Sequence, residues 1–305
     1  MTSPARAHLG VPVALIIGSC VSLQFGAALA VQLFPHLGSW GVTALRLSFA
    51  ALVLLVIARP RVHRWTKQQW IAVAWFGLSM AGMNGFFYAA LSRIPLGPAV
   101  AIEFLGPLVL AAVLSRGAID FAGVGIAVAG IALFGIDGLL GAEPLNLVGV
   151  GCVLIAASFW ALYIRKSARV GELVPGVGGL AMALVFASII LLPFGIPAAI
   201  EVAGSPHLIW LALGTGLLAS VVPYTLEFLA LRRLPQRVFG ILASLEPVFA
   251  ALFGWILLSQ GVSVLKLIGI ALVVTASAVT TLVPRKKTDP PQPGTFTGSI
   301  PIIPE

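Results

Sequence analysis

Four ionisable side chains interrupt the long apolar stretches of this sequence: Arg46, Glu103, Glu227 and Glu246. Each would cost about 2.5–3.5 kcal/mol at the centre of a membrane helix, so each is expected to face an interior cavity or a partner. Arg46 and Glu103 are expected at a matching depth, roughly 9–12 Å below the outer surface at a rise of about 1.5 Å per residue. They can therefore form an ion pair, which either holds helices together or acts in function.

The two other carboxylates differ in their expected depth. Glu246 lies about nine residues into its apolar stretch, near the midplane, where no Lys or Arg is expected. A carboxylate buried away from cations can bind and release a proton near neutral pH, which favours a proton-coupling role. Glu227 is expected within about one turn of the cytoplasmic end of its stretch. It either acts in function or extends to the interface.

Three neutral polar residues accompany these charges: Asn84, Tyr88 and Tyr224. Asn84 and Tyr88 are four residues apart and share a helix face. Such groups either hydrogen-bond a substrate or join neighbouring helices. With Arg46 as the buried cation, a small zwitterion fits better than a polyphosphate: the cation would bind its carboxylate and a carboxylate its amine.

The sequence lacks the signatures of several other classes of protein. It has no GxxxxGK[ST] phosphate loop and no HExxH or clustered His and Cys set, so neither direct ATP use nor a metal site is expected. We expect no cofactor. Cys20 and Cys152 lie within apolar stretches and are interpreted as small core residues.

Composition makes lipid the solvent of this chain. Of 305 residues, 59% are apolar and 9% are charged, and the mean hydropathy is +1.07. A soluble domain carries about 25% charged residues. The net charge of +8 does not indicate a nucleic-acid partner, because the cations sit in short runs between apolar stretches. The composition therefore predicts an all-α, polytopic membrane protein.

Ten stretches are long enough to cross the hydrocarbon core as helices, which takes about 20 residues each. They cover residues 9–31, 39–58, 69–91, 95–115, 119–136, 147–166, 174–195, 207–230, 237–258 and 263–283. With a cytoplasmic amino terminus, 15 of the 18 Lys and Arg residues fall on the inner side. These are Arg6, Arg59, Arg61, Arg64, Lys67, Arg116, Arg165, Lys166, Arg169, Arg232, Arg233, Arg237, Arg285, Lys286 and Lys287. This bias predicts a cell-membrane protein with both termini in the cytoplasm.

An internal similarity appears at an offset of 140 residues. Residues 90–95 (ALSRIP) resemble 230–235 (ALRRLP), and 105–107 (LGP) resemble 245–247 (LEP). Chance resemblance of apolar helices is the alternative, but the shared prolines favour a repeat. Five helices per repeat insert with opposite orientation, the inverted arrangement typical of secondary transporters. We therefore predict repeats over 1–140 and 141–284, followed by a disordered, proline-rich cytoplasmic tail over 285–305.

Two prolines lie at corresponding positions of these repeats. Pro107 and Pro247 each lack an N–H and free the carbonyl four residues earlier. Such positions either line a cavity and act as hinges or are simply tolerated in membrane helices.

Several motifs resemble the threonine/homoserine exporters of the EamA family, within the drug/metabolite transporter superfamily. They are Gly41-Val42-Thr43-Ala44-Leu45-Arg46-Leu47, Gly82-Met83-Asn84, Pro95-Leu96-Gly97, Ala99-Val100-Ala101, Glu103-Phe104, Gly106-Pro107, Pro223-Tyr224, Leu226-Glu227, Leu234-Pro235, Arg237, Phe239-Gly240 and Glu246-Pro247. The resemblance runs over all ten stretches. It implies ten helices in two inverted five-helix repeats, and export of amino acids such as threonine or homoserine driven by proton exchange.

Our hypothesis from the sequence is a proton-coupled exporter of small neutral amino acids that works by alternating access. Glu246 would exchange a proton for the substrate amine. Arg46 and Glu103 would form an outer gate or receive the substrate carboxylate, and Asn84, Tyr88 and Tyr224 would shape the pocket. A broader metabolite or drug exporter is the alternative, and the sequence leaves the oligomeric state open.

Two other classes of protein are weaker alternatives. An intramembrane enzyme would need a catalytic pair, for which Glu103 and Glu246 are the available residues, without a matching nucleophile or metal ligand. A passive channel would show non-saturating flux.

Overall fold

The computed structural model describes residues 10–115, 118–140, 145–174, 176–231 and 243–282, and every regular element in these ranges is a helix. The all-α prediction is therefore confirmed for this part of the chain. The tail predicted to be disordered, residues 285–305, lies outside the described residues.

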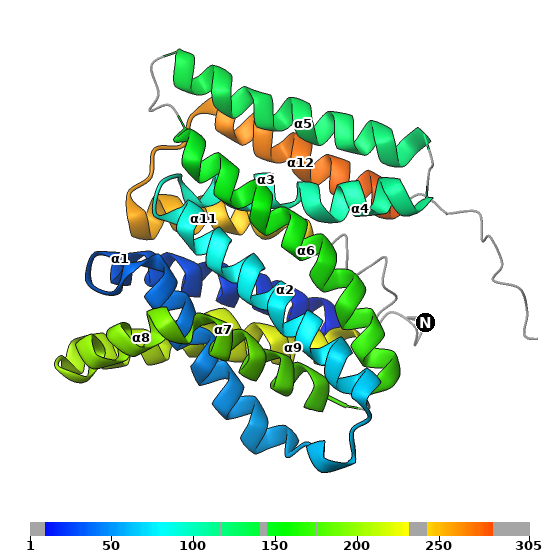
Figure 1. Cartoon of the computed structure of the whole chain (residues 1–305). Helices are drawn as coiled ribbons and strands as arrows, with labels where there is room; N and C mark the ends of the chain where they lie inside the picture. The colour runs from blue at the N-terminus through cyan, green and yellow to red at the C-terminus, as the bar shows by residue number, and fades with distance from the viewer. Residues whose placement is uncertain (1–9, 116–117, 141–144, 175, 232–242, 283–305) are drawn as a thin grey trace, which may run out of the picture.

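The first helix, α1 (Gly10–Ala58), contains two segments that run in different directions (Figure 1). Gly38 joins them with φ 65° and ψ 157°, a conformation that glycine adopts without a steric cost. Pro35 lies just before this bend. The stretches predicted over 9–31 and 39–58 correspond to the two segments on either side of Gly38.

The elements that follow agree closely with the predicted stretches. A short 3₁₀ turn (Val62–Arg64) leads to α2 (Lys67–Leu91), and the later continuous helices are α5 (Ala118–Leu139), α6 (Leu147–Leu173), α7 (Gly178–Ala203) and α12 (Val264–Leu282). Thr66 caps α2 by accepting a hydrogen bond from the Gln69 N–H at 3.3 Å. Six described segments are long and apolar enough to cross a membrane, and the first of them, Val13–Ala58, includes the bend at Gly38. Three shorter apolar helices accompany them, and the count of ten spans stays a prediction.

Three of the predicted stretches are interrupted in the structure. The stretch 95–115 forms α3 (Leu96–Glu103) and α4 (Leu105–Ser115), which part at Phe104. A turn at Ser244 and Leu245 precedes α11 (Glu246–Leu258), so 237–258 is not one continuous helix. These two interruptions are 140 residues apart, and each shortly precedes a proline, Pro107 or Pro247.

The third interruption lies in the stretch 207–230. It divides into α8 (Pro206–Gly216), a π-helical turn η2 (Leu217–Val221) and α9 (Val222–Leu231). A π turn widens the helix by one residue and leaves carbonyl groups without their usual partners. The free carbonyls of this turn face α1, as described below.

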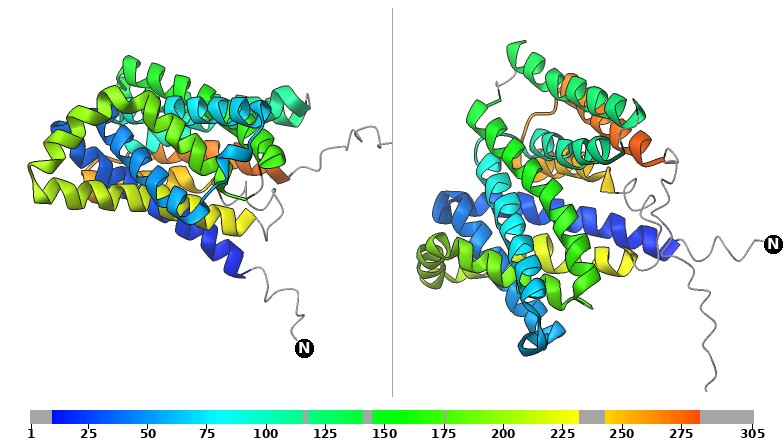
Figure 2. Two further views of the ribbon diagram at one scale, coloured as in Figure 1. Left: turned by 60° about the horizontal axis from the view of Figure 1, so that its bottom comes forward. Right: turned by 45° about the vertical axis from the view of Figure 1, so that its right-hand side comes forward.

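Small residues bring the helices close together. A Cβ added to Gly26 of α1 would lie 2.6 Å from the Ala219 nitrogen of η2, and one added to Gly82 of α2 would lie 2.6 Å from the Phe159 ring of α6. The second segment of α1 approaches α7 at Gly41, α3 approaches α11 at Gly97, and α5 approaches α12 at Gly130. The α5–α12 pair lies at one edge of the bundle and the α8–α9 pair at the other (Figures 1 and 2). Such contacts are the usual means by which membrane helices associate.

A buried ion pair also joins α5 to α12. The Lys266 Nζ lies 3.7 Å from the Asp137 Oδ2, and their side chains are 14% and 7% exposed. Sequence reasoning missed Asp137 because it lies one residue beyond the predicted stretch 119–136.

We expect Gly106→Ala to destabilise the protein by about 1–3 kcal/mol, the usual cost of overpacking. A Cβ at this position would lie 2.1 Å from the Ala157 carbonyl oxygen of α6, a backbone atom that cannot rotate away. The thermal unfolding midpoint of the purified protein in detergent measures this effect. Gly125→Ala is the matched control, because its Cβ would meet nothing within 4 Å. Equal midpoints for the two variants would contradict this account of the packing.

Candidate functional site

Arg46 is the centre of the candidate site, on the second segment of α1. The residue is 3% exposed, so its charge is removed from solvent. Its Nη1 donates a hydrogen bond to the Ala219 carbonyl of η2 at 2.6 Å, and its Nη2 donates one to the Asn84 Oδ1 of α2. Its Cζ lies 4.6 Å from the centroid of the Tyr88 ring, in cation–π contact. Three elements distant in sequence thus meet at one guanidinium group.

The predicted pair Asn84 and Tyr88 does share a face of α2, and both contact Arg46. The Asn84 Nδ2 donates to the Met80 carbonyl at 2.8 Å, which directs the amide oxygen toward Arg46. Tyr88 is 1% exposed and packs edge-to-face against Phe34 at 5.7 Å. The Tyr88 hydroxyl is buried and has no hydrogen-bond partner among the described residues.

The carbonyl that accepts from Arg46 is available because of the local backbone. In η2 the Val222 N–H bonds to the Leu217 carbonyl, so it does not reach Leu218. Pro223 has no N–H to give to Ala219, four residues earlier. The Ser22 hydroxyl of α1 donates to the freed Leu218 carbonyl at 2.7 Å, and Arg46 donates to the freed Ala219 carbonyl. Sequence reasoning missed this acceptor, although Pro223 within a predicted span was a signal for it.

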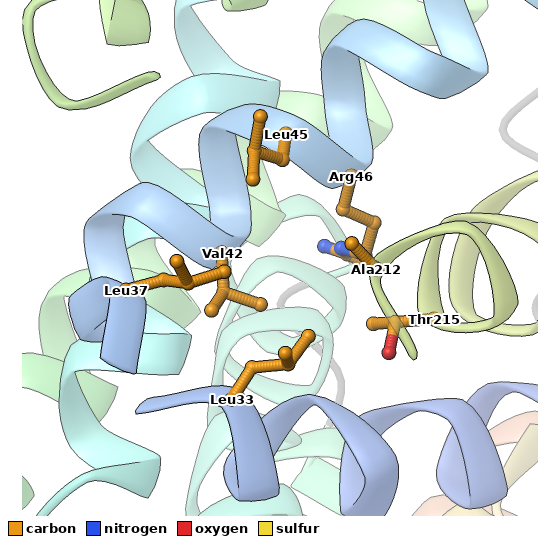
Figure 3. A pocket seen from close by; sticks show the side chains of 7 residues that line it. All are labelled: Leu33, Leu37, Val42, Leu45, Arg46, Ala212 and Thr215. Carbon is orange, nitrogen blue, oxygen red and sulfur yellow. The ribbon is translucent and has the colours of Figure 1, made fainter. Parts of the chain in front are cut away.

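A narrow crevice lies beside Arg46 (Figure 3). It is lined by Leu33, Leu37, Val42, Leu45, Arg46, Ala212 and Thr215, and it is too narrow to hold a water molecule. The Arg46 Nε and the Thr215 hydroxyl are buried and without hydrogen-bond partners among the described residues. Leaving such a group unpaired costs about 1–3 kcal/mol. The structure therefore describes a closed arrangement that retains unused polar groups beside the guanidinium.

The predicted direct ion pair between Arg46 and Glu103 is wrong. Glu103 is the last residue of α3, and no salt bridge within 4.0 Å joins it to Arg46 in the described part of the chain. The two charges are still close enough to interact electrostatically. A matching predicted depth therefore does not imply contact between the two side chains.

The other predicted residues are Glu246, Tyr224 and Glu227, which belong to α11 and α9. Glu246 is the first residue of α11, where the helix dipole favours a negative charge. Its carboxylate does not lack interaction partners, so it is not the isolated group that the sequence suggested. Tyr224 of α9 packs against the apolar cluster of α2, α7 and the second segment of α1. Glu227 belongs to α9, and its side chain is outside the part of the chain that the structure describes.

The site offers charge and hydrogen bonds rather than metal ligation. Within the described ranges no three His, Cys, Asp or Glu side chains gather to hold a metal ion. A buried guanidinium with an amide, an aromatic ring and a hydroxyl nearby is suited to bind a small anion or zwitterion.

Comparison with known proteins gives a consistent result. Residues 147–282 match the EamA-like transporter family. The threonine/homoserine exporter RhtA of Escherichia coli (strain K12) is 37% identical over 279 residues, covering 90% of this chain and 93% of that protein. The exporter of the same name from Salmonella typhimurium (strain SL1344) is 36% identical over 288 residues, covering 93% and 96%.

A solved crystal structure shares the fold. Its chain is 21% identical, with a TM-score of 0.59, and the match covers 88% of this chain and 96% of that one. The relatives are exporters and the family is one of transporters, so this multi-pass membrane protein is a transporter and not an enzyme. With more than a third of its residues identical to RhtA over nine-tenths of its length, the chain belongs to the EamA-like transporter family.

Proposed function

We propose that the protein exports small neutral amino acids, such as threonine or homoserine, by proton antiport with alternating access. The names and the 36–37% identity of its relatives support this choice of substrate. The distribution of Lys and Arg supports a location in the cell membrane with both termini in the cytoplasm.

The observation that carries the proposal is the environment of Arg46. Among the described residues, its direct partners are an amide, a backbone carbonyl and an aromatic ring, none of which carries a negative charge. A buried cation with only neutral partners retains a strong attraction for an anion. The carboxylate of an amino acid supplies that anion and can accept two hydrogen bonds from the guanidinium. Asn84 and Tyr88 hold the guanidinium in place for it.

The amine and the proton require carboxylates on the substrate pathway. We place the substrate zwitterion between Arg46 and Glu103, the last residue of α3. Glu246 is partly exposed at the start of α11, next to a turn in the backbone. We assign Glu103 to the substrate ammonium and Glu246 to proton exchange, with Tyr224 and Glu227 on α9 as further residues of the pathway.

Alternating access follows from an inverted repeat of 1–140 and 141–284. At the 140-residue offset, α2 corresponds to α8 and α9, and the first segment of α1 corresponds to α6. The packing supports this division, because α2 packs against α6, and α8 and α9 pack against the first segment of α1. Two pairs of corresponding helices also pack on each other: α5 on α12, and the second segment of α1 on α7. In transporters of this architecture one repeat moves against the other around a central site.

A broader metabolite exporter is the second candidate. Apart from Arg46 and Thr215, the side chains that line the closed crevice are all apolar, so an opened form of it would also suit a less polar substrate. Competition by organic anions and lipophilic cations in the exchange assay separates the two. Inhibition by threonine and homoserine alone favours the amino-acid exporter.

We expect Arg46→Gln to raise the half-saturation concentration for threonine exchange in proteoliposomes at least about tenfold. Loss of one member of a buried charge pair costs about 2–5 kcal/mol, and about 1.4 kcal/mol corresponds to a factor of ten. Arg46→Lys keeps the charge but not the planar fork and should be intermediate. Arg93→Gln is the control, since this arginine lies at the end of α2 and bonds to the Ala89 carbonyl. Wild-type affinity in folded Arg46→Gln protein would refute the carboxylate-binding role.

We expect Glu246→Gln to separate exchange from proton coupling. The amide cannot release a proton, so uphill export driven by a pH gradient should stop while threonine–threonine exchange continues. Internal pH and labelled threonine are followed together in the same vesicles. Glu172→Gln is the control, because Glu172 is exposed and pairs with Arg169 at the surface. Proton movement at the wild-type rate in Glu246→Gln would remove Glu246 from the mechanism.

A further inference from the structure

The hydrogen bond between Arg46 and the Ala219 carbonyl joins two parts of the bundle that are far apart in the sequence. Arg46 belongs to the second segment of α1, and Ala219 belongs to η2. Beside it, the Ser22 hydroxyl of the first segment bonds to the preceding carbonyl, Leu218. Gly26 allows this close approach, since its added Cβ would lie within 2.6 Å of the Ala219 nitrogen. We call this contact between α1 and η2 the α1–η2 seam.

A carrier needs a partner for a buried guanidinium both with and without substrate. In a low-dielectric interior an arginine without acceptors is strongly unfavourable. A substrate carboxylate can satisfy Arg46 in the loaded carrier, but the empty carrier must return without it. The Ala219 carbonyl is an acceptor built into the protein, and it is available because Pro223 supplies no N–H.

We propose that the Ala219 carbonyl is the internal partner that occupies Arg46 when no substrate is bound, and that a substrate carboxylate replaces it. Pro223 is then a positioning residue, which acts on Arg46 by leaving this carbonyl without a helical donor. The proposal rests on the carboxylate-binding role of Arg46 given above. Because replacement removes the Arg46 hydrogen bond from this carbonyl, substrate binding weakens the α1–η2 seam and favours its opening.

Pro223→Ala tests the proposal, because alanine restores the N–H that a regular helix would give to the Ala219 carbonyl. Arg46 then loses part of its internal partner, and a substrate carboxylate meets less competition. The half-saturation concentration for threonine exchange should fall by about two- to tenfold, the range expected from one net hydrogen bond. Net efflux should slow by a similar factor relative to exchange, because net efflux requires the protonated, substrate-free carrier to return and exchange does not.

Pro193→Ala is the matched control. Pro193 also lies within a helix, α7, but it is exposed and the carbonyl that it frees is that of Ile189, on the outside of the bundle. This variant should leave both exchange and net efflux unchanged. A Pro223→Ala protein that folds and shows unchanged or higher half-saturation, or equal losses of exchange and net efflux, would overturn the proposal.

A second measurement leaves Pro223 in place. In a protein carrying Cys20→Ser and Cys152→Ser, the variant Ser22→Cys places a thiol at the α1–η2 seam. Threonine should accelerate its alkylation by a water-soluble maleimide, whereas an unchanged rate would count against seam opening. Failure of the proposal is distinct from failure of the carboxylate role. If Arg46→Gln loses affinity while Pro223→Ala and the labelling behave as wild type, only the present proposal is wrong.

Discussion

The absence of water in the hydrocarbon core is the constraint on which this structure depends. Every backbone polar group and every charge there must find its partner within the protein. Arg46 is the strictest case, since a permanently charged guanidinium is buried among apolar helices. The π turn and Pro223 interrupt the helical hydrogen bonds of the backbone and free two carbonyls, and Ser22 and Arg46 of α1 donate hydrogen bonds to them. The packing of α8 and α9 against α1 therefore provides a hydrogen-bond acceptor for the buried charge of Arg46.

The same logic explains why interrupted helices recur in the bundle. Irregular backbone at membrane depth is tolerated where protein covers it or where it lines a cavity. One interruption, at Phe104, separates α3 from α4, and the other, at Ser244 and Leu245, precedes α11. Helices α3 and α11 pack on each other at Gly97. The continuous helices α2, α6 and α12 pack against α3. Charged residues occur at the interruptions, with Glu103 ending α3 and Glu246 beginning α11.

Much of this arrangement could be predicted from residue types alone, and the failures have identifiable causes. The cost of placing a charge in the membrane identifies Arg46 as a candidate, and helix periodicity places Asn84 and Tyr88 on one face. The sequence could not predict that the Ala219 carbonyl accepts a hydrogen bond from Arg46, because any residue type has a backbone carbonyl. Glu103 was misplaced because depth along a helix fixes height and not direction around the axis. Asp137 was overlooked because it lies just beyond an apolar stretch, where a charge seemed to need no explanation.

The ion pair of Asp137 and Lys266 has a consequence for biogenesis. The ribosome makes Asp137 long before Lys266, so the first half of the chain enters the membrane with a carboxylate whose cation does not yet exist. That carboxylate is buried between α5 and α12 only when the last described helix has been inserted. In a chain truncated before α12, Asp137 lacks this cation and α5 lacks the helix against which it packs. The pair therefore forms only after almost the whole chain has been made.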